Sequence, residues 1–132
     1  MPAGIPRPRG RVRRERLLNR TRADAVLAAD VYAVAGFGGR FLGLMGHPGL
    51  PAGQALVLEG DNSIHTLFMR FSIDVLFLDA AGRVLALYHA LPPWRLSRLV
   101  RGTRRIVELP PGVLAATGTQ AGDLLAFEPW PA

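Results

Sequence analysis

Hydrophobic residues of this chain fall in short runs that glycine, proline and polar residues interrupt. Runs of this length, rich in β-branched and aromatic residues, are typical of β-strands. The longest covers residues 63–79, SIHTLFMRFSIDVLFLD, and predicts either one bent strand or two strands that meet near Ser72. Residues 79–83, DAAGR, predict a hairpin turn, because Gly82 suits the left-handed position after a type I turn.

The same pattern continues along the rest of the chain. Glycine and proline occur at close intervals, and the helical stretches are too few and too short for alternating α/β units. We therefore expect a mainly β fold, an antiparallel sandwich or barrel. The predicted strands span residues 30–35, 54–59, 64–71, 73–79, 84–91, 103–109 and 124–128, and residues 17–29 are also expected to be extended. Two short helices are predicted, at residues 40–46 and 111–117.

The basic charge of the chain is concentrated near its N-terminus. All sixteen basic residues are arginine, and eight of them precede residue 23, where Glu15 is the only acidic residue. Residues 1–16 also hold three prolines and two glycines without hydrophobic periodicity, so they predict a disordered tail. A single domain is expected over residues 17–132. Residues 1–22 could contact an anionic polymer, either nucleic acid or anionic lipid, or could serve only to solubilise the protein.

Composition excludes several classes of site. The chain has no cysteine, which rules out disulfides and thiolate metal sites. The three histidines, His47, His65 and His89, show no ligand spacing, so neither a metal site nor a cofactor is expected. No apolar run reaches about 18 residues, so no transmembrane segment is predicted. The twin arginines at positions 13 and 14 precede charged residues rather than the apolar core of a signal peptide, and we expect a cytoplasmic protein.

Three residues within the longest hydrophobic run are candidates for chemistry. Asp74 shares strand parity with Leu76 and Leu78, which predicts a buried carboxylate that needs a partner. The candidate partners are His65, Arg70, Arg104 and Arg105. A catalytic hypothesis pairs His65 with Asp74 at one end of the barrel, where the imidazole acts as a base or a ligand. A structural hypothesis makes the same residues a buried network that fixes strand register, and no nucleophile motif lies beside them.

A second candidate surface is the basic loop at residues 94–102. It combines Trp94 with three arginines and could bind an anionic or sugar-like ligand, or could be an exposed loop around a packed tryptophan. Glu108 and Asp123 stand beside predicted turns, where they are expected to pair with Arg104 or Arg105 and to cap a turn. The predicted ligand-binding residues are therefore His65, Arg70, Asp74, Trp94 and Arg95.

Seven segments, taken in order, resemble one protein family. They are Leu18-Asn19-Arg20-Thr21, RFLGLMG at 40–46, IHTLFMRFSIDVLFLD at 64–79, GRVL at 82–85, LPPWR at 91–95, VELPPG at 107–112 and TGTQAGDLL at 117–125. Together they are similar to the uncharacterised domain-of-unknown-function family 192. The resemblance implies a small β-rich domain, a sandwich or barrel of jelly-roll type with short helices. It supplies no activity.

Three functions remain open from the sequence. The favoured hypothesis is a non-catalytic binding or accessory domain for an unknown small ligand or protein. The second is an enzyme that uses His65 and Asp74. The third is association with nucleic acid through the arginine-rich tail.

Overall fold

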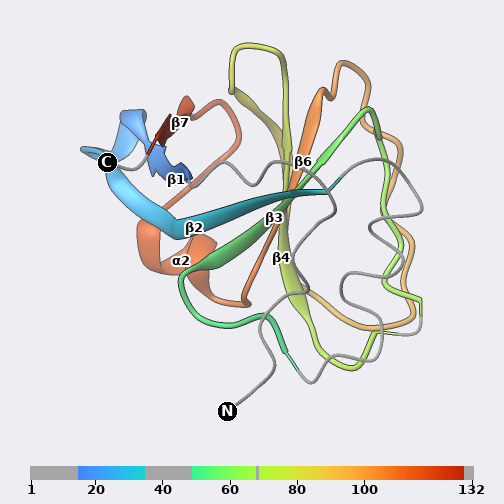
Figure 1. Cartoon of the computed structure of the whole chain (residues 1–132). Helices are drawn as coiled ribbons and strands as arrows, with labels where there is room; N and C mark the ends of the chain where they lie inside the picture. The colour runs from blue at the N-terminus through green and yellow to red at the C-terminus, as the bar shows by residue number, and fades with distance from the viewer. Residues whose placement is uncertain (1–14, 35–48, 68, 130–132) are drawn as a thin grey trace.

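The computed structural model describes residues 15–34, 49–67 and 69–129, which form a mainly β fold (Figure 1). Seven strands of this part of the chain join in one sheet that curls into a half-barrel. The strands are β1 (Glu15–Asn19), β2 (Ala25–Val34), β3 (Gln54–Glu59), β4 (Ile73–Leu78), β5 (Val84–Leu91), β6 (Arg105–Leu109) and β7 (Leu125–Pro129). The described residues also form a 3-10 helix, η1 (Arg20–Arg22), and a short helix, α2 (Val113–Thr117).

The strand order is β5-β4-β6-β3-β2-β1-β7, and one pairing departs from the predicted antiparallel sheet. β2 and β3 run parallel, whereas the other neighbours are antiparallel. A parallel pair needs a long crossover, and residues 35–53 provide that length between the two strands. The strands belong to a single curled sheet, so the jelly-roll arrangement implied by the resemblance is not confirmed.

The direction of the curl follows from a contact between β6 and β7. Three strands separate these two in the sheet, which in a flat sheet would place them roughly 19 Å apart. The Arg105 guanidinium nevertheless lies 5.0 Å from the centroid of the Phe127 ring. The face that carries both side chains is therefore the inside of the curl. The two edges of the sheet also meet at one corner, through a bridge between Arg83 and Leu124.

Hydrophobic clusters cover both faces of the sheet. Along β4, side chains alternate between the inner face, with Leu76 and Leu78, and the outer face, with Val75 and Phe77. Leu114 of α2 packs into the inner cluster. The outer cluster also includes loop residues, among them Ile64, Met69 and Val100. Every residue of β4 is buried, which explains why its sequence is an unbroken hydrophobic run around one aspartate.

Several predicted elements are confirmed and one is wrong. The hairpin at residues 79–83 joins β4 to β5, with Gly82 at φ 92°, and α2 ends at Gly118 as the sequence indicated. Residues 64–71 were predicted as a strand, but their described part makes only an isolated bridge between His65 and Leu96. Their backbone bonds go instead to the loop after β5.

Other predictions fall at or beyond the edges of the described chain. Glu15 and Arg16, which the sequence assigned to the tail, belong to β1. Residues 1–14 and the predicted helix at 40–46 lie outside the described residues, so the second helix is not confirmed. Within the described ranges, no helix is long and apolar enough to cross a membrane.

Candidate functional site

Asp74 is fully buried on the inner face of β4, and its carboxylate accepts three backbone hydrogen bonds. Oδ1 accepts from the amide of Ala90 at 2.8 Å. Oδ2 accepts from the amides of Gly112 at 3.1 Å and Leu114 at 2.9 Å. A buried carboxylate is tolerated when charge-assisted bonds of this kind replace its water. Asp74 thereby links the end of β5 and the start of α2 to β4, the strand next to the edge of the sheet.

The predicted partners of Asp74 lie elsewhere. His65 belongs to a segment that packs over the outer face through Ile64, whereas Asp74 points to α2 on the inner face. The side chain of Arg70 is exposed. The Asp74 carboxylate is bound by the amides of Ala90, Gly112 and Leu114 and not by His65.

Thr66 joins the other two candidate regions, the segment around His65 and the loop around Trp94. This threonine is fully buried. Its hydroxyl donates to the carbonyl of Pro92 at 2.6 Å and accepts from the amide of Arg95 at 2.8 Å. Its backbone accepts from the amide of Trp94 at 2.9 Å and donates to the carbonyl of Arg95 at 2.8 Å. His65, Trp94 and Arg95 consequently belong to one surface.

The loop is held along its whole length. The amide of Ser97 donates to the carbonyl of Ile64, and that of Val100 to the carbonyl of Asn62, both at 2.8 Å. The amide of Arg98 donates to the Tyr88 hydroxyl at 3.0 Å. These bonds fix the backbone of residues 94–101, which we call the 94–101 loop, although it contains little regular structure.

Hydrophobic side chains of the 94–101 loop face solvent. Trp94 is 56% exposed, Leu96 is 72% exposed and Leu99 is 64% exposed. Among the described residues, only Val26 is a further large hydrophobic with comparable exposure, at 51%. Three exposed arginines, at positions 95, 98 and 101, alternate with them, and the loop has no acidic residue. The result is a rigid surface that is both apolar and basic.

A buried polar network around Asn19 was not anticipated from the sequence. Asn19 is fully buried, and its Oδ1 accepts from the amides of Thr21 and Arg22. Its Nδ2 donates to the Thr119 hydroxyl and to Asp123 Oδ2, each at 3.0 Å. Asn19, Thr119 and Asp123 come from two of the segments that carry the family resemblance, which was the available signal. The network joins β1 to the turn before β7.

The Asp123 carboxylate is the charged member of this network. Burial alone would raise its pKa, but hydrogen bonds from Arg22, from Asn19 and from the amide of Gln120 outweigh burial and lower the pKa. Asp123 thus has a wider structural role than the predicted turn cap. Glu108 is fully buried on β6, opposite Leu56 and Val75 in the register.

The described arginines of residues 1–22 bind acidic side chains of the protein itself. Arg16 and Arg20 both pair with Glu128, with a distance of 2.9 Å between Arg16 Nη2 and Glu128 Oε2. Hydrogen bonds from Arg20 and Arg16 lower the pKa of Glu128. Arg22 Nε lies 3.0 Å from Asp123 Oδ2. These contacts are intramolecular, and residues 1–14 lie outside the described chain.

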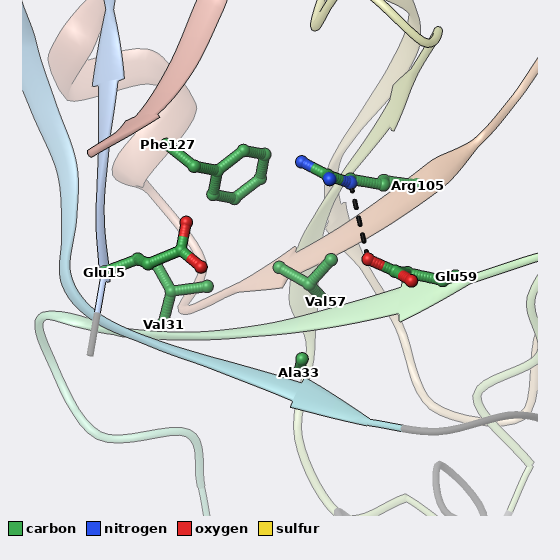
Figure 2. A pocket seen from close by; sticks show the side chains of 7 residues that line it. All are labelled: Glu15, Val31, Ala33, Val57, Glu59, Arg105 and Phe127. Atoms are coloured by element: carbon green, nitrogen blue, oxygen red, sulfur yellow. Dashed lines mark ion pairs between the residues drawn. The ribbon is translucent and has the colours of Figure 1, made fainter. Parts of the chain in front are cut away.

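A pocket of about 260 Å³ opens at the inner face of the half-barrel (Figure 2). Five strands supply its lining residues, which are Glu15, Val31, Ala33, Val57, Glu59, Arg105 and Phe127. Arg105 Nε lies 3.5 Å from Glu59 Oε1, and its guanidinium stands over the Phe127 ring. A more open hollow beside the pocket shares Glu59 and Arg105. Within the described part of the chain, no group of three acidic or histidine side chains is placed to hold a metal ion.

Comparison with known proteins identifies the family. The model of the domain-of-unknown-function family 192, described as "Uncharacterized ACR", matches residues 19–127. The chain belongs to this family. A UPF0127 protein of Thermococcus sibiricus is 34% identical over 116 residues, which cover 85% of this chain and 74% of the relative. A UPF0127 protein of Pyrococcus furiosus is 41% identical over 91 residues, covering 67% of this chain and 78% of the relative.

Two solved structures share the fold. A protein of unknown function from Novosphingobium aromaticivorans superposes with a TM-score of 0.76 at 17% identity, covering 96% of this chain and 92% of the other. A Sinorhizobium meliloti protein described as a proposed transcription regulator gives a TM-score of 0.70 at 20% identity, covering 89% and 98%. At these identities the likeness concerns the fold alone.

Proposed function

We propose that the protein is a non-catalytic binding domain whose 94–101 loop docks on an anionic phospholipid surface. One observation carries the proposal. Three of the four most exposed large hydrophobic side chains in the described ranges lie within six residues of one rigid loop, between three arginines. Hydrophobic side chains gathered in this way mark an interaction surface rather than chance exposure.

The chemistry of the loop matches the layers of a membrane surface. Tryptophan is favoured at the interface, where its ring is buried and its N–H remains near polar groups. Leu96 and Leu99 would enter the acyl boundary, while arginine side chains reach back to the phosphates. Each arginine near an anionic surface contributes about 1 kcal/mol. The bonds to Thr66, Ile64 and Asn62 order the loop beforehand, which lowers the entropy cost of docking.

The expected cytoplasmic location fits this proposal. The cytoplasmic leaflet carries the anionic lipids and a negative surface potential. A domain with no described membrane-spanning helix would associate with it reversibly, through its loop alone.

Two other functions compete. Nucleic acid is also anionic, and the S. meliloti neighbour is described as a proposed transcription regulator. Trp94 and the arginines suit nucleic acid, but Leu96 and Leu99 would stay in water on a phosphate backbone. The enzyme hypothesis relied on a His65–Asp74 pair, and the Asp74 carboxylate instead holds three backbone amides.

The test is co-sedimentation with vesicles of phosphatidylglycerol and phosphatidylcholine, compared with phosphatidylcholine alone. We expect binding only to the anionic vesicles, and a blue shift of Trp94 emission in a Trp130→Phe background. The Leu96→Ser/Leu99→Ser variant should bind at least tenfold more weakly, because burying a leucine contributes about 1.5–3 kcal/mol. Val26→Ser, which removes an exposed hydrophobic side chain elsewhere, should bind like the wild type.

Several results would contradict the proposal. One is a wild type that does not bind anionic vesicles, and another is a double leucine variant that binds them normally. Tighter binding to duplex or single-stranded DNA than to the vesicles would favour the nucleic-acid hypothesis instead.

A further inference from the structure

The two ends of the inner face differ. At one end α2 covers the inner face, with Leu114 fully buried and the start of the helix bound to Asp74. At the other end no described element covers the inner side chains, and the pocket of about 260 Å³ opens there. The mouth of a β-barrel is a common place for a small-molecule site.

The lining changes from apolar to charged toward this open end. Along β3, the inner position after Val57 is Glu59. On β1 and β6 the inner faces continue from the cores of those strands to Glu15 and Arg105. Figure 2 shows Glu15 on one side of the cavity, Glu59 and Arg105 on the other, and the small aliphatic side chains as its floor. An apolar floor with a few converging polar groups is the usual composition of a ligand pocket.

The charges at the rim favour a cation. The rim carries two carboxylates and one guanidinium. Arg105 is already engaged, since it pairs with Glu59 and stands over Phe127. Glu15 is only partly exposed, and none of the described residues forms an ion pair with it. A carboxylate held over an apolar floor attracts an ammonium or guanidinium group more strongly than one in open water.

The aromatic wall favours the same ligand class. An aromatic ring attracts a cation within about 6 Å of its centroid, and Phe127 already shows this contact with Arg105. The cavity is slightly smaller than the roughly 300–1,000 Å³ of drug-sized sites, so its ligand has few heavy atoms. We infer that this pocket is a second binding site, separate from the 94–101 loop, for a small organic cation: an ammonium or guanidinium group on a short alkyl chain.

The inference is tested with three ligands of equal length: n-pentylammonium, 1-pentanol and pentanoate. Titration calorimetry on the full chain should show binding of the ammonium, weaker binding of the alcohol and none of the carboxylate. Butylammonium and propylammonium should bind progressively more weakly, by about fourfold for each methylene removed, because the pocket floor buries the alkyl group of the ligand. Equal or tighter binding of pentanoate, or no binding of the ammonium at millimolar concentration, would overturn the inference.

Variants locate the site. Glu15→Gln should lower the affinity for n-pentylammonium at least fivefold, and Glu59→Gln should also lower it. Asp24→Asn is the matched control, because it removes the same charge at a residue that pairs with Arg20 and does not line the pocket. Thermal melts confirm that each variant is folded. Wild-type affinity in both Glu15→Gln and Glu59→Gln would place the cation elsewhere and contradict the assignment.

The two proposed sites can fail separately. The Leu96→Ser/Leu99→Ser variant, designed to abolish vesicle binding, should bind n-pentylammonium like the wild type. A parallel loss of both activities would show that the ammonium binds at the loop rather than in the pocket.

Discussion

Asp74 shows how a single carboxylate can organise this fold. It is the second residue of β4, a strand that is otherwise hydrophobic, and its bonds are to the amides of Ala90, Gly112 and Leu114. Ala90 has a left-handed backbone, with φ 48°, at the end of β5. A carboxylate can accept all three bonds at once, whereas most neutral side chains cannot. The Asp74 carboxylate therefore accepts hydrogen bonds from backbone amides at the end of β5 and at the start of α2, where regular secondary structure supplies no acceptor.

Asp74→Asn should destabilise the protein by about 2–4 kcal/mol, since the new amide group would face a backbone donor and leave it unsatisfied. Urea unfolding followed by circular dichroism measures this change. Asp61→Asn, at the partly exposed turn after β3, is the control and should cost less than about 0.5 kcal/mol. An Asp74→Asn variant as stable as the wild type would contradict the structural role of Asp74 and would favour a functional role instead.

Asp123 predicts a dependence of stability on pH. Its folded-state pKa is lower than its ordinary value of about 3.9, so the unfolded chain binds a proton first as the pH falls. Its contribution is complete above about pH 5, and it is lost as the pH falls from about 4 through the folded-state value. The difference in unfolding free energy between wild type and Asp123→Asn should therefore be constant near neutrality and shrink in acid. Urea titrations at a series of pH values measure it, and a difference that persists unchanged at about pH 2 would contradict this role.

At the scale of elements, the corner between the β4–β5 hairpin and β7 closes the curl. The amide of Leu125 donates to the carbonyl of Gly82 at 2.9 Å, and the amide of Val84 donates to the carbonyl of Asp123 at 2.8 Å. A Cβ atom at Gly82 would lie 2.4 Å from the Leu125 carbonyl oxygen. Glycine is needed here both for its left-handed backbone and for this close approach.

Gly82→Ala should consequently lower the free energy of unfolding more than Gly122→Ala does. Gly122→Ala is a control in the same corner. Gly122 has nearly the same backbone, φ 91° against 92°, but a methyl group added there would have no atom within 4 Å. Gly122→Ala should cost about 1–2 kcal/mol for the left-handed conformation alone. Gly82→Ala should exceed this by at least about 1 kcal/mol, measured by chemical unfolding. Equal decreases in unfolding free energy for the two variants would show that the corner accommodates the added methyl group at residue 82 without strain.

Local patterns were sufficient for many of the elements. Short hydrophobic runs, β-branched residues and glycine turns indicated β3, β4, β5 and the hairpin between β4 and β5. They were misleading at residues 64–71, where an equally hydrophobic segment is tied to the 94–101 loop instead of entering a sheet. The partner of a hydrophobic segment is a tertiary property, and local periodicity does not contain it.

The same distinction applies to the candidate site. Loop composition predicted a candidate surface at Trp94 and Arg95, and both side chains are exposed. Apolar neighbours predicted that Asp74 is a buried carboxylate, which is confirmed. The sequence did not reveal that the Asp74 carboxylate binds three backbone amides, those of Ala90, Gly112 and Leu114. It also did not reveal the pocket, whose lining comes from five strands and depends on the curl. The local sequence does not predict that β2 and β3 run parallel. Nor does it predict that Arg105 contacts Phe127.

At the scale of the whole molecule, the half-barrel separates two different surfaces. The 94–101 loop packs with the outer cluster, through Val100, and presents apolar and basic side chains. The pocket opens on the inner face and has an acidic rim around Glu15 and Glu59. The rigid sheet between them contains no described hinge that would link one site to the other, so we expect the two binding events to be energetically independent.

The pairing of β1 with β7 has a consequence for how the protein is made. Leu17 pairs with Phe127, so β1 meets its outer neighbour only when β7 has been synthesised. At about 5–20 residues per second, a ribosome needs roughly 5 to 20 seconds to cover that distance. Throughout this interval the nascent chain presents an incomplete sheet edge that could pair with another chain. The time between translation of the first and the last strand is therefore the period in which chaperones would matter most for this fold.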